Sequence, residues 1–266
     1  MGKNKIGIIG GGNMGEALIK GLVGKKLFAP NSILVCEVDI KRAQSLKKKY
    51  HIGAGDLNTV VAQSSVVILA VKPQDMENVL SQITEHNKLF ISIAAGLTTK
   101  FFEKRLGGRP RVVRAMPNMP ALIGEGIAGI CTGKYATAAD LRKAQEILNT
   151  IGETVIFKES MMDAVTAVSG SGPAYVFLFV EQWIAAAISL GLSKIDARNL
   201  VYETLAGSAH LLRKTGFTAS DLRAKVTSKG GTTEAAMKIF LKNNTFGKLM
   251  KNALAAAKKR AKELAK

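Results

Sequence analysis

A glycine-rich turn near the amino terminus, in the segment KIGIIGGGNMGEALIKGLVG at 5–24, constrains the fold of this chain more than any other feature. β-Branched residues before the turn favour a buried strand, and apolar residues after it recur at helical spacing. Gly10, Gly12 and Gly15 give the pattern G-x-G-x-x-G. Between a strand and a helix, these glycines permit a tight turn, the approach of a pyrophosphate and close helix–strand packing. The segment therefore predicts a dinucleotide-binding turn whose helix N–H groups face phosphates; a glycine-rich turn in another kind of α/β protein is the alternative.

Strand-like and helix-like segments alternate over the first 160 residues, which predicts a parallel sheet with helices on both faces. The expected strands are 6–9, 32–37, 66–71, 89–94, 111–115, 127–131 and 154–157. The expected helices between them are 41–50, 58–63, 74–83, 98–106 (capped by Thr98) and 138–149. Beyond residue 160 only helices are expected, at 161–168, 173–190, 194–214, 219–226, 232–242 and 246–264. The sequence therefore predicts an α/β dinucleotide-binding domain over 1–160 and an all-helical domain over 161–266.

The net charge of +18 raises the question of nucleic-acid or membrane binding. Seven basic residues and one acid fall within 248–266, but alanines and leucines separate the lysines, which is typical of a helix with a solvated basic face. No nucleic-acid-binding motif accompanies this segment, and aromatic residues make up only 6% of the chain. We therefore expect no specific nucleic-acid partner, and attribute the charge to the attraction of an anionic cofactor and an anionic substrate.

Neither a membrane span nor a secretory signal is expected. The longest apolar segment, 174–192, is interrupted by two polar residues and predicts a buried helix. The glycines at 10–12 break the first apolar run too early for a signal sequence. Cys36 and Cys131 lie in strand-like runs, which is typical of reduced core cysteines. The sequence therefore predicts a cytoplasmic protein.

One acidic and two basic residues near the end of the second expected strand favour different cofactors. Glu37 lies 22 residues after Gly15, where a carboxylate accepts a hydrogen bond from the adenosine ribose and favours NAD. Lys41 and Arg42 follow closely and could instead meet a 2′-phosphate, which favours NADP. A solvated strand end with no ligand is the third interpretation.

Three further expected strands end in short motifs, and open α/β sheets bind ligands at the carboxyl ends of their strands. The motif AVKP at 70–73 places Lys72 toward a cofactor, and AAG at 94–96 leaves room for a flat ring. The motif MPNMP at 116–120 fixes the backbone with two prolines around Asn118, whose amide both donates and accepts hydrogen bonds.

Two motifs stand out in the helical half. The segment SGSGPAY at 169–175 is a flexible hinge before a helix that begins with proline, and it lacks the first glycine of a G-x-S-x-G nucleophile elbow. The segment SKGGTT at 228–233 places two glycines and three hydroxyls before a helix, which predicts an anion-binding nest. A capped turn between helices is the alternative. Because the three histidines are isolated and the cysteines lack ligand spacing, no metal site is expected.

Taken together, GGGNMG, AVKP, MPNMP, SGSGPAY and SKGGTT resemble pyrroline-5-carboxylate reductase in order and spacing over almost the entire chain. The resemblance implies the reduction of 1-pyrroline-5-carboxylate to L-proline with NADPH or NADH, the final step of proline biosynthesis. It also implies a Rossmann-type domain followed by a helical domain that builds dimers, often assembled into rings. One departure is Lys229, where the family usually has proline before the paired glycines.

The resemblance also assigns residues to roles. Cofactor contacts fall on Gly10, Gly11, Gly12, Asn13, Met14, Glu37, Asn58 (adenine side), Ala70, Val71, Lys72, Pro73, Ala95, Gly96 and Asn118. Substrate contacts fall on Glu159, Ser228, Gly231, Thr232 and Thr233, with the Thr233 hydroxyl as the catalytic partner of the imine nitrogen. Dense apolar residues on the later helices predict a homodimer that brings residues 228–233 near the partner's nicotinamide site. A hydroxyacid dehydrogenase of similar build and a non-catalytic NAD(P)-binding protein are the alternatives.

Overall fold

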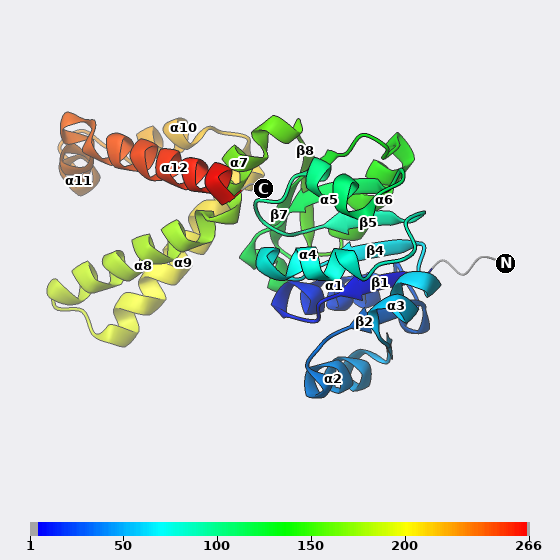
Figure 1. Cartoon of the computed structure of the whole chain (residues 1–266). Coiled ribbons are helices and arrows are strands. Elements are labelled where there is room, and N and C mark those ends of the chain that lie inside the picture. Colours follow the sequence, from blue (N-terminus) through cyan, green and yellow to red (C-terminus); the bar gives the residue numbers. More distant parts are fainter. Residues whose placement is uncertain (1–4, 265–266) are drawn as a thin grey trace. The chain divides into compact units, whose positions relative to one another are not determined.

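The computed structural model describes residues 5–264 (Figure 1). Within them the chain divides into two compact units, residues 5–173 together with 256–264, and residues 174–255. The outer ends of the two expected domains, 1–4 and 265–266, lie outside the described residues, as does Lys266 of the basic segment.

The first unit contains an eight-stranded sheet with the order β3-β2-β1-β4-β5-β6-β7-β8. The strands are β1 (Ile6–Ile9), β2 (Ile33–Cys36), β3 (Gly53–Ala54), β4 (Val66–Leu69), β5 (Leu89–Ser92), β6 (Arg111–Met116), β7 (Gly126–Thr132) and β8 (Gly152–Ile156). The seven strands expected from the sequence are present, and the short edge strand β3 is additional.

The expectation of a parallel sheet is wrong for one pair of neighbouring strands, β6 and β7. The strands from β3 to β6 are mutually parallel, but β7 pairs antiparallel with β6, in a register that places Ala115 opposite Ile130. The connection, residues 117–125, is shorter than the dozen or more residues that a parallel crossover needs. Because helix α6 (Ala138–Leu148) connects β7 to β8, those two strands are parallel again.

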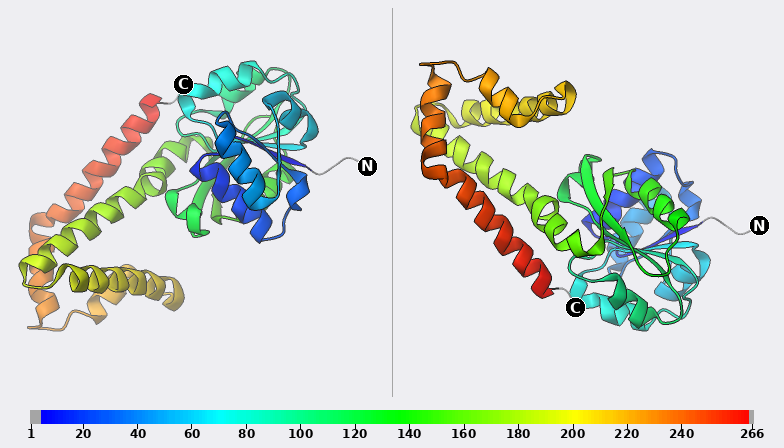
Figure 2. Two further views of the ribbon diagram at one scale, coloured as in Figure 1. Left: turned by 90° about the horizontal axis from the view of Figure 1, so that it is seen from below. Right: turned by 90° about the horizontal axis from the view of Figure 1, so that it is seen from above.

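Helices cover both faces of this sheet (Figure 1, Figure 2), as the sequence predicted. Alternate residues of β1 point to opposite faces, so Ile6 and Ile8 enter one core and Ile9 the other. The first core is completed by α1 (Asn13–Gly24), α2 (Ile40–Tyr50) and α6. The second is completed by α3 (Leu57–Gln63), α4 (Pro73–Ser81) and α5 (Thr99–Leu106). The Thr98 hydroxyl accepts a hydrogen bond from the Phe101 N–H and caps α5, as expected.

The first unit continues beyond the domain boundary expected near residue 160. After the turn η3 (Glu159–Met161), helix α7 (Met162–Val165) packs against β7, with both end residues of α7 buried beside Cys131. A π-helical turn, η4 (Thr166–Gly170), follows. The first of the two stretches that make up this unit therefore ends at residue 173, and the boundary near residue 160 stays a prediction.

The second unit is entirely helical within its described residues. Its helices are α8 (Gly172–Ser189), α9 (Lys194–Thr215), α10 (Ala219–Lys225), α11 (Thr232–Leu241), the turn η5 (Lys242–Asn244) and the first half of α12 (Thr245–Leu264). Only three of its apolar residues are buried in the single chain, namely Ala187, Ala197 and Val201. The apolar helix expected to be buried therefore lies open, with the Phe177 side chain 56% exposed.

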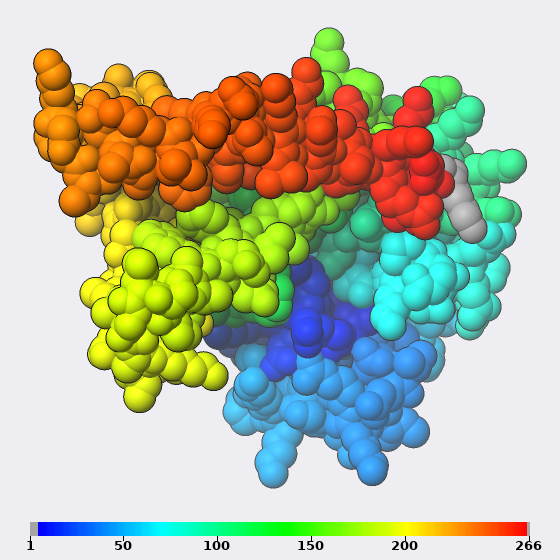
Figure 3. All heavy atoms as spheres, turned by 90° about the vertical axis from the view of Figure 1, so that its left-hand side faces the viewer, coloured from blue at the N-terminus to red at the C-terminus, as the bar shows by residue number. Residues whose placement is uncertain are grey.

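One helical stretch of the described residues, Glu159–Ser189, is long and apolar enough to cross a membrane, judged by length and composition alone. Only 17% of its most apolar window is buried in the single chain. Glu181 and Gln182 lie in this stretch. Figure 3 shows the first half of α12 (orange) lying along α8 (yellow-green). Residues of these two helices, together with Leu205 of α9, line an apolar groove of about 480 Å³.

Candidate active site

The glycine turn (residues 10–12) lies at the point where the strand order reverses, between β2 and β4 on either side of β1. Gly10 has a φ of +102°, and a Cβ there would come within 2.7 Å of the Ala70 carbonyl oxygen. A Cβ at Gly15 would lie 2.1 Å from the Gly10 carbonyl oxygen, so α1 could not approach the strand as closely. A Cβ at Gly12 would meet nothing within 4 Å. The turn therefore leaves open space directly before the first N–H groups of α1.

The first N–H groups of a helix have no partner within the helix. Gly12 is the N-cap of α1, and Asn13 and Met14 are the first two residues of that helix. Their N–H groups and the positive end of the helix dipole suit a pyrophosphate. The open space at Gly12 gives that group room, so this region fits the dinucleotide that the fingerprint predicts.

The Glu37 carboxylate contacts the glycine turn directly. Its Oε2 accepts a hydrogen bond from the Gly11 N–H at 2.7 Å, and its Oε1 accepts one from the Asp39 N–H at 3.0 Å. Glu37 is half-buried and lies just after β2. The structure therefore places this carboxylate beside the turn, where it repels further negative charge, and assigns it two backbone partners that the sequence did not reveal.

Arg42 also contacts the glycine turn, but from helix α2. Its Nε donates a hydrogen bond to the Gly11 carbonyl oxygen at 2.9 Å, and its guanidinium pairs with Glu16 of α1. Glu16 also accepts hydrogen bonds from Lys49 and from the Tyr50 hydroxyl, both at 2.9 Å. The hydrogen bond from Lys49, with those from Tyr50 and Arg42, outweighs burial and lowers the pKa of Glu16 from 4.5 to about 2. Glu16 is therefore an anion at neutral pH, and it holds α2 against the first turn of α1.

Other predicted cofactor residues follow neighbouring strands of the same sheet. Ala70 and Val71 come after β4, and Lys72 is the exposed N-cap of α4, with Pro73 as the first helical residue. Ala95 and Gly96 come after β5, and Gly96 has a φ of +78°. The remaining two are Asn118, whose Oδ1 accepts a hydrogen bond from the Ile127 N–H at 2.9 Å, and Asn58, which is exposed in the first turn of α3. Because β1, β4, β5 and β6 are parallel, these segments share one edge of the sheet.

Glu159 has a set of partners that the sequence did not suggest. Its Oε1 accepts a hydrogen bond from the Thr99 N–H and its Oε2 one from the Thr99 hydroxyl, both at 2.7 Å. Arg114 of β6, only 3% exposed, approaches the same carboxylate at 3.5 Å and Asp163 at 4.0 Å. Glu159 therefore holds the start of α5, just after Ala95 and Gly96. A substrate contact by Glu159 stays a prediction, and both its oxygens already accept hydrogen bonds.

The predicted substrate loop (residues 228–233) lies in the second unit and ends at the N-terminus of α11. The expectation that the paired glycines expose their N–H groups is wrong. The Gly230 N–H donates to Glu234 Oε2 at 2.9 Å, and the Gly231 N–H donates to the Ser228 carbonyl oxygen at 3.1 Å. The helix donors lie one residue later, because Gly231 is the N-cap and Thr232 the first helical residue.

The Ser228 hydroxyl lies beside this helix end. A Cβ at Gly231 would lie 2.5 Å from Ser228 Oγ, so glycine leaves the space that the hydroxyl occupies. Ser228 and Thr232 are exposed, and Thr233 is half-buried. Hydroxyls and N–H groups at the positive end of a helix suit a small carboxylate.

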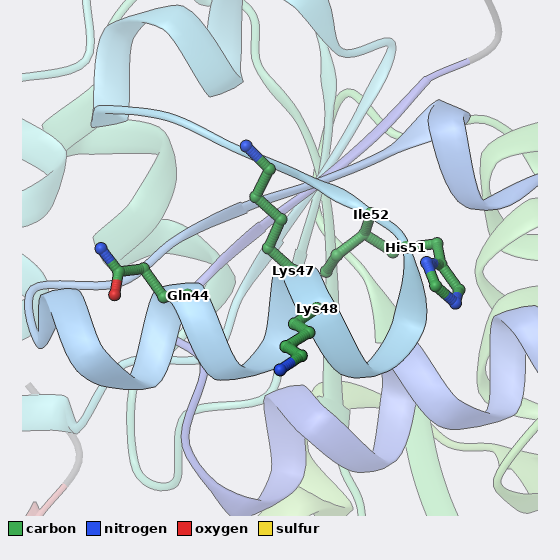
Figure 4. Close-up of a pocket in the computed structure, with 5 residues that line it drawn as sticks. All are labelled: Gln44, Lys47, Lys48, His51 and Ile52. Carbon is green, nitrogen blue, oxygen red and sulfur yellow. The ribbon is translucent and has the colours of Figure 1, made fainter.

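A hollow on α2, with a cavity volume of about 400 Å³, is not part of this site. It is lined by Gln44, Lys47, Lys48, His51 and Ile52 (Figure 4). Figure 4 shows the side chains of Gln44, Lys47, Lys48 and His51 pointing away from one another. They offer no common point of contact to a ligand.

The fold and the glycine turn define a dinucleotide-binding protein, in which the first unit is joined to a helical unit with little core of its own. The family description "Pyrroline-5-carboxylate reductase dimerisation" matches residues 159–264, and "NADP oxidoreductase coenzyme F420-dependent" matches residues 5–96. The pyrroline-5-carboxylate reductase of Methanosarcina acetivorans is 38% identical, with 100% of both chains covered. That of Mycobacterium tuberculosis is 36% identical over 99% of this chain and 97% of that protein.

Solved structures agree. The pyrroline-5-carboxylate reductase from Coxiella burnetii has a TM-score of 0.93 at 36% identity and covers 99% of each chain. The enzyme from Plasmodium falciparum, solved with NADP bound, has a TM-score of 0.88 at 31% identity and covers 100% of each chain. This chain belongs to the pyrroline-5-carboxylate reductase family. It is an NAD(P)H-dependent enzyme that reduces 1-pyrroline-5-carboxylate to L-proline and forms a homo-oligomer, and the two alternative functions are not favoured.

Sequence reasoning missed three residues around this site. Glu16 directly follows the last fingerprint glycine, and its partners become visible only when α2 lies beside α1. Arg114 interrupts an apolar strand, and a charge at such a position signals a buried partner. Thr99, which Glu159 contacts, gave no signal of its own in the sequence.

Proposed function

We propose that the two units divide the work of the reaction: the first holds NAD(P)H, and residues 228–233 of the second hold 1-pyrroline-5-carboxylate. The observation that carries this proposal is the pair of helix N-termini, α1 with open space at Gly12 and α11 with hydroxyls at Thr232 and Thr233. Each suits an anion, one a pyrophosphate and the other a small carboxylate.

On the cofactor side, we propose that the N–H groups of Gly12, Asn13 and Met14 receive the pyrophosphate. In this arrangement the dinucleotide lies along Ala70, Val71, Lys72 and Pro73. Its nicotinamide lies near Ala95, Gly96 and Asn118, and its adenine lies on the side of Asn58. Bound NAD(P)H supplies the hydride, so the chain's own residues have to orient the two reactants and exclude water.

On the substrate side, we propose that the Ser228 hydroxyl and the N–H groups of Thr232 and Thr233 bind the carboxylate. The Thr233 hydroxyl accepts a hydrogen bond from the protonated imine nitrogen. Hydride addition to the imine carbon turns the C=N double bond into a single bond, and the nitrogen keeps its proton as it becomes a secondary amine. The positive charge of the imine is lost in this step, so no strong general base is required.

We propose that the homo-oligomer contains a dimer in which residues 228–233 of one copy lie near the nicotinamide site of the partner. The exposed apolar surface of α8 and the match to a dimerisation domain support this arrangement. Assembly of such dimers into a larger ring is a further expectation from the family resemblance, and size-exclusion chromatography with light scattering tests both.

We propose that NADH serves at least as well as NADPH, because the Glu37 carboxylate beside the glycine turn would repel a 2′-phosphate. We also propose a cytoplasmic location without a specific nucleic-acid partner. Both cysteines are free, and burial raises their pKa values, that of Cys131 to about 12. Thiols of this kind react slowly and suit a reducing compartment.

The test is a spectrophotometric assay of NADH and NADPH oxidation with 1-pyrroline-5-carboxylate, on the wild type and three variants. Thr233→Ala is expected to lower kcat about 10- to 100-fold, because a hydrogen bond to a charged group contributes about 1.5–3 kcal/mol. Ser228→Ala is expected chiefly to raise KM, because the carboxylate contact is the same in the ground state and the transition state.

Thr227→Ala is the matched control, because the Thr227 hydroxyl donates to the Arg223 carbonyl oxygen in α10. Normal kinetics in Thr233→Ala and Ser228→Ala, with only a lowered melting temperature, would show that residues 228–233 merely cap a helix.

A further inference from the structure

The glycine turn contains three glycines in succession, which makes it the most flexible kind of backbone. A Cβ at Gly12 would meet nothing within 4 Å, so the outer side of the turn has no neighbouring side chain against which to pack. A pyrophosphate site nevertheless requires N–H groups fixed in direction before the ligand arrives. Contacts outside the turn therefore have to hold it.

Gly11, the middle residue, has such contacts on both its backbone groups. Its N–H donates to Glu37 after β2, and its carbonyl oxygen accepts from Arg42 of α2. The first contact lies across 26 residues of sequence and the second across 31. The turn is thus fixed by two side chains that follow β2 in the sequence, one from the loop after that strand and one from helix α2.

Arg42 is itself fixed at its far end. Its side chain is 32% exposed and pairs with Glu16, whose side chain is 19% exposed. Lys49 and Tyr50 hold the Glu16 carboxylate from the other end of α2. The guanidinium therefore bridges the carbonyl oxygen of Gly11 and the first turn of α1, and its Nε–H is committed to the turn.

We infer that Arg42 is a positioning residue that fixes Gly11 so that the turn can receive the pyrophosphate common to NADH and NADPH, and that it is not the ligand of the 2′-phosphate. This inference rests on the proposed cofactor site. It differs from the hypothesis drawn from the sequence, in which Arg42 binds the 2′-phosphate that distinguishes NADPH from NADH. The inference concerns Arg42 alone and assigns no role to its exposed neighbour Lys41.

The two interpretations differ in what the loss of Arg42 does to each cofactor. Arg42→Met keeps the aliphatic stem and removes all donors, and we expect it to weaken NADH and NADPH alike, each about 5- to 30-fold. The ratio of the two Kd values should stay within about twofold. Arg42→Lys keeps the charge but loses the planar fork, so it should not restore binding.

The experiment is a titration of purified full-length homo-oligomer with each reduced cofactor, followed by nicotinamide fluorescence. Lys48→Met is the matched control, since it removes an equal charge from the same helix, on the side shown in Figure 4. Glu16→Gln is a second variant that loosens Arg42 without touching Gly11, and it should weaken both cofactors by a smaller factor. Melting temperatures establish that each protein is folded during the titration.

Four results would overturn the inference: a loss confined to NADPH in Arg42→Met, restoration of binding by Arg42→Lys, an equal loss in Lys48→Met, or unchanged binding in both Arg42→Met and Glu16→Gln. A wild type that binds neither cofactor would instead overturn the cofactor site itself.

Discussion

Replacement of Glu16 by Gln probes the electrostatic centre of the first unit. The Glu16 carboxylate accepts hydrogen bonds from Lys49 and Tyr50 and pairs with Arg42. These donors stabilise the charged form, and together they lower the pKa of Glu16 from 4.5 to about 2. Gln keeps the shape and removes the charge, so the variant isolates the electrostatic part of the contact.

The free energy at stake follows from the shift in pKa. A difference of about 2.5 between the unfolded and folded pKa values corresponds to about 3 kcal/mol at pH 7. The Lys49 side chain is 61% exposed, so solvent screens the largest contribution. We therefore expect Glu16→Gln to lower the free energy of unfolding by about 1–2 kcal/mol at pH 7.

The stabilisation by the Glu16 carboxylate should decrease as the pH is lowered. Because the folded pKa lies below the unfolded one, the stabilisation is complete above pH 4.5 and is lost as the pH falls towards 2. At pH 3.5 about 60% of it should remain. The difference between wild type and Glu16→Gln should therefore narrow between pH 7 and pH 3.5.

Urea denaturation followed by circular dichroism measures this difference. Both proteins need the same concentration, because the stability of an oligomer depends on it. Glu125→Gln, at an exposed glutamate before β7, serves as the control. Equal stabilities of wild type and Glu16→Gln at pH 7, or a gap that widens on acidification, would refute the reasoning.

Two further predictions concern cofactor choice and assembly. Glu37→Ser removes the carboxylate that contacts the Gly11 N–H, so the ratio of kcat/KM for NADPH to that for NADH should rise; a strong preference of the wild type for NADPH would contradict this. Leu178→Asp places a charge on an apolar side chain of α8 that is 58% exposed in the single chain, and light scattering should show a shift toward monomer. Ile123→Asp, at an apolar residue of the first unit that is 72% exposed, should leave the mass unchanged.

The elements of the fold were predictable because their signals are local. The strand–turn–helix pattern around Gly10, Gly12 and Gly15 placed the cofactor turn, and the Thr98 cap placed the start of α5. Apolar periodicity located all the helices of the second unit. Motif spacing alone led to the family, which the comparisons confirmed.

Partners of polar side chains were not predictable, because each depends on which elements pack together. The Gly230 and Gly231 N–H groups were expected to face a ligand, and only the folded loop shows that Glu234 and Ser228 accept them. Glu159 was expected near the substrate, and its carboxylate accepts hydrogen bonds from Thr99, 60 residues away. The sequence offers every such side chain several partners of suitable charge.

The sequence by itself therefore determined the glycine turn and the order of the helices and of every strand except the short edge strand β3; the reaction followed only from the resemblance of its motifs to a known family. Those properties depend on backbone preferences and on side chains a few residues apart. The tertiary structure alone decided that Arg42 bridges Gly11 and Glu16, and that β7 runs against β6. Both depend on contacts between segments that are distant in the sequence. Such contacts form only after packing has brought the segments together, so the sequence pattern of either segment does not reveal them.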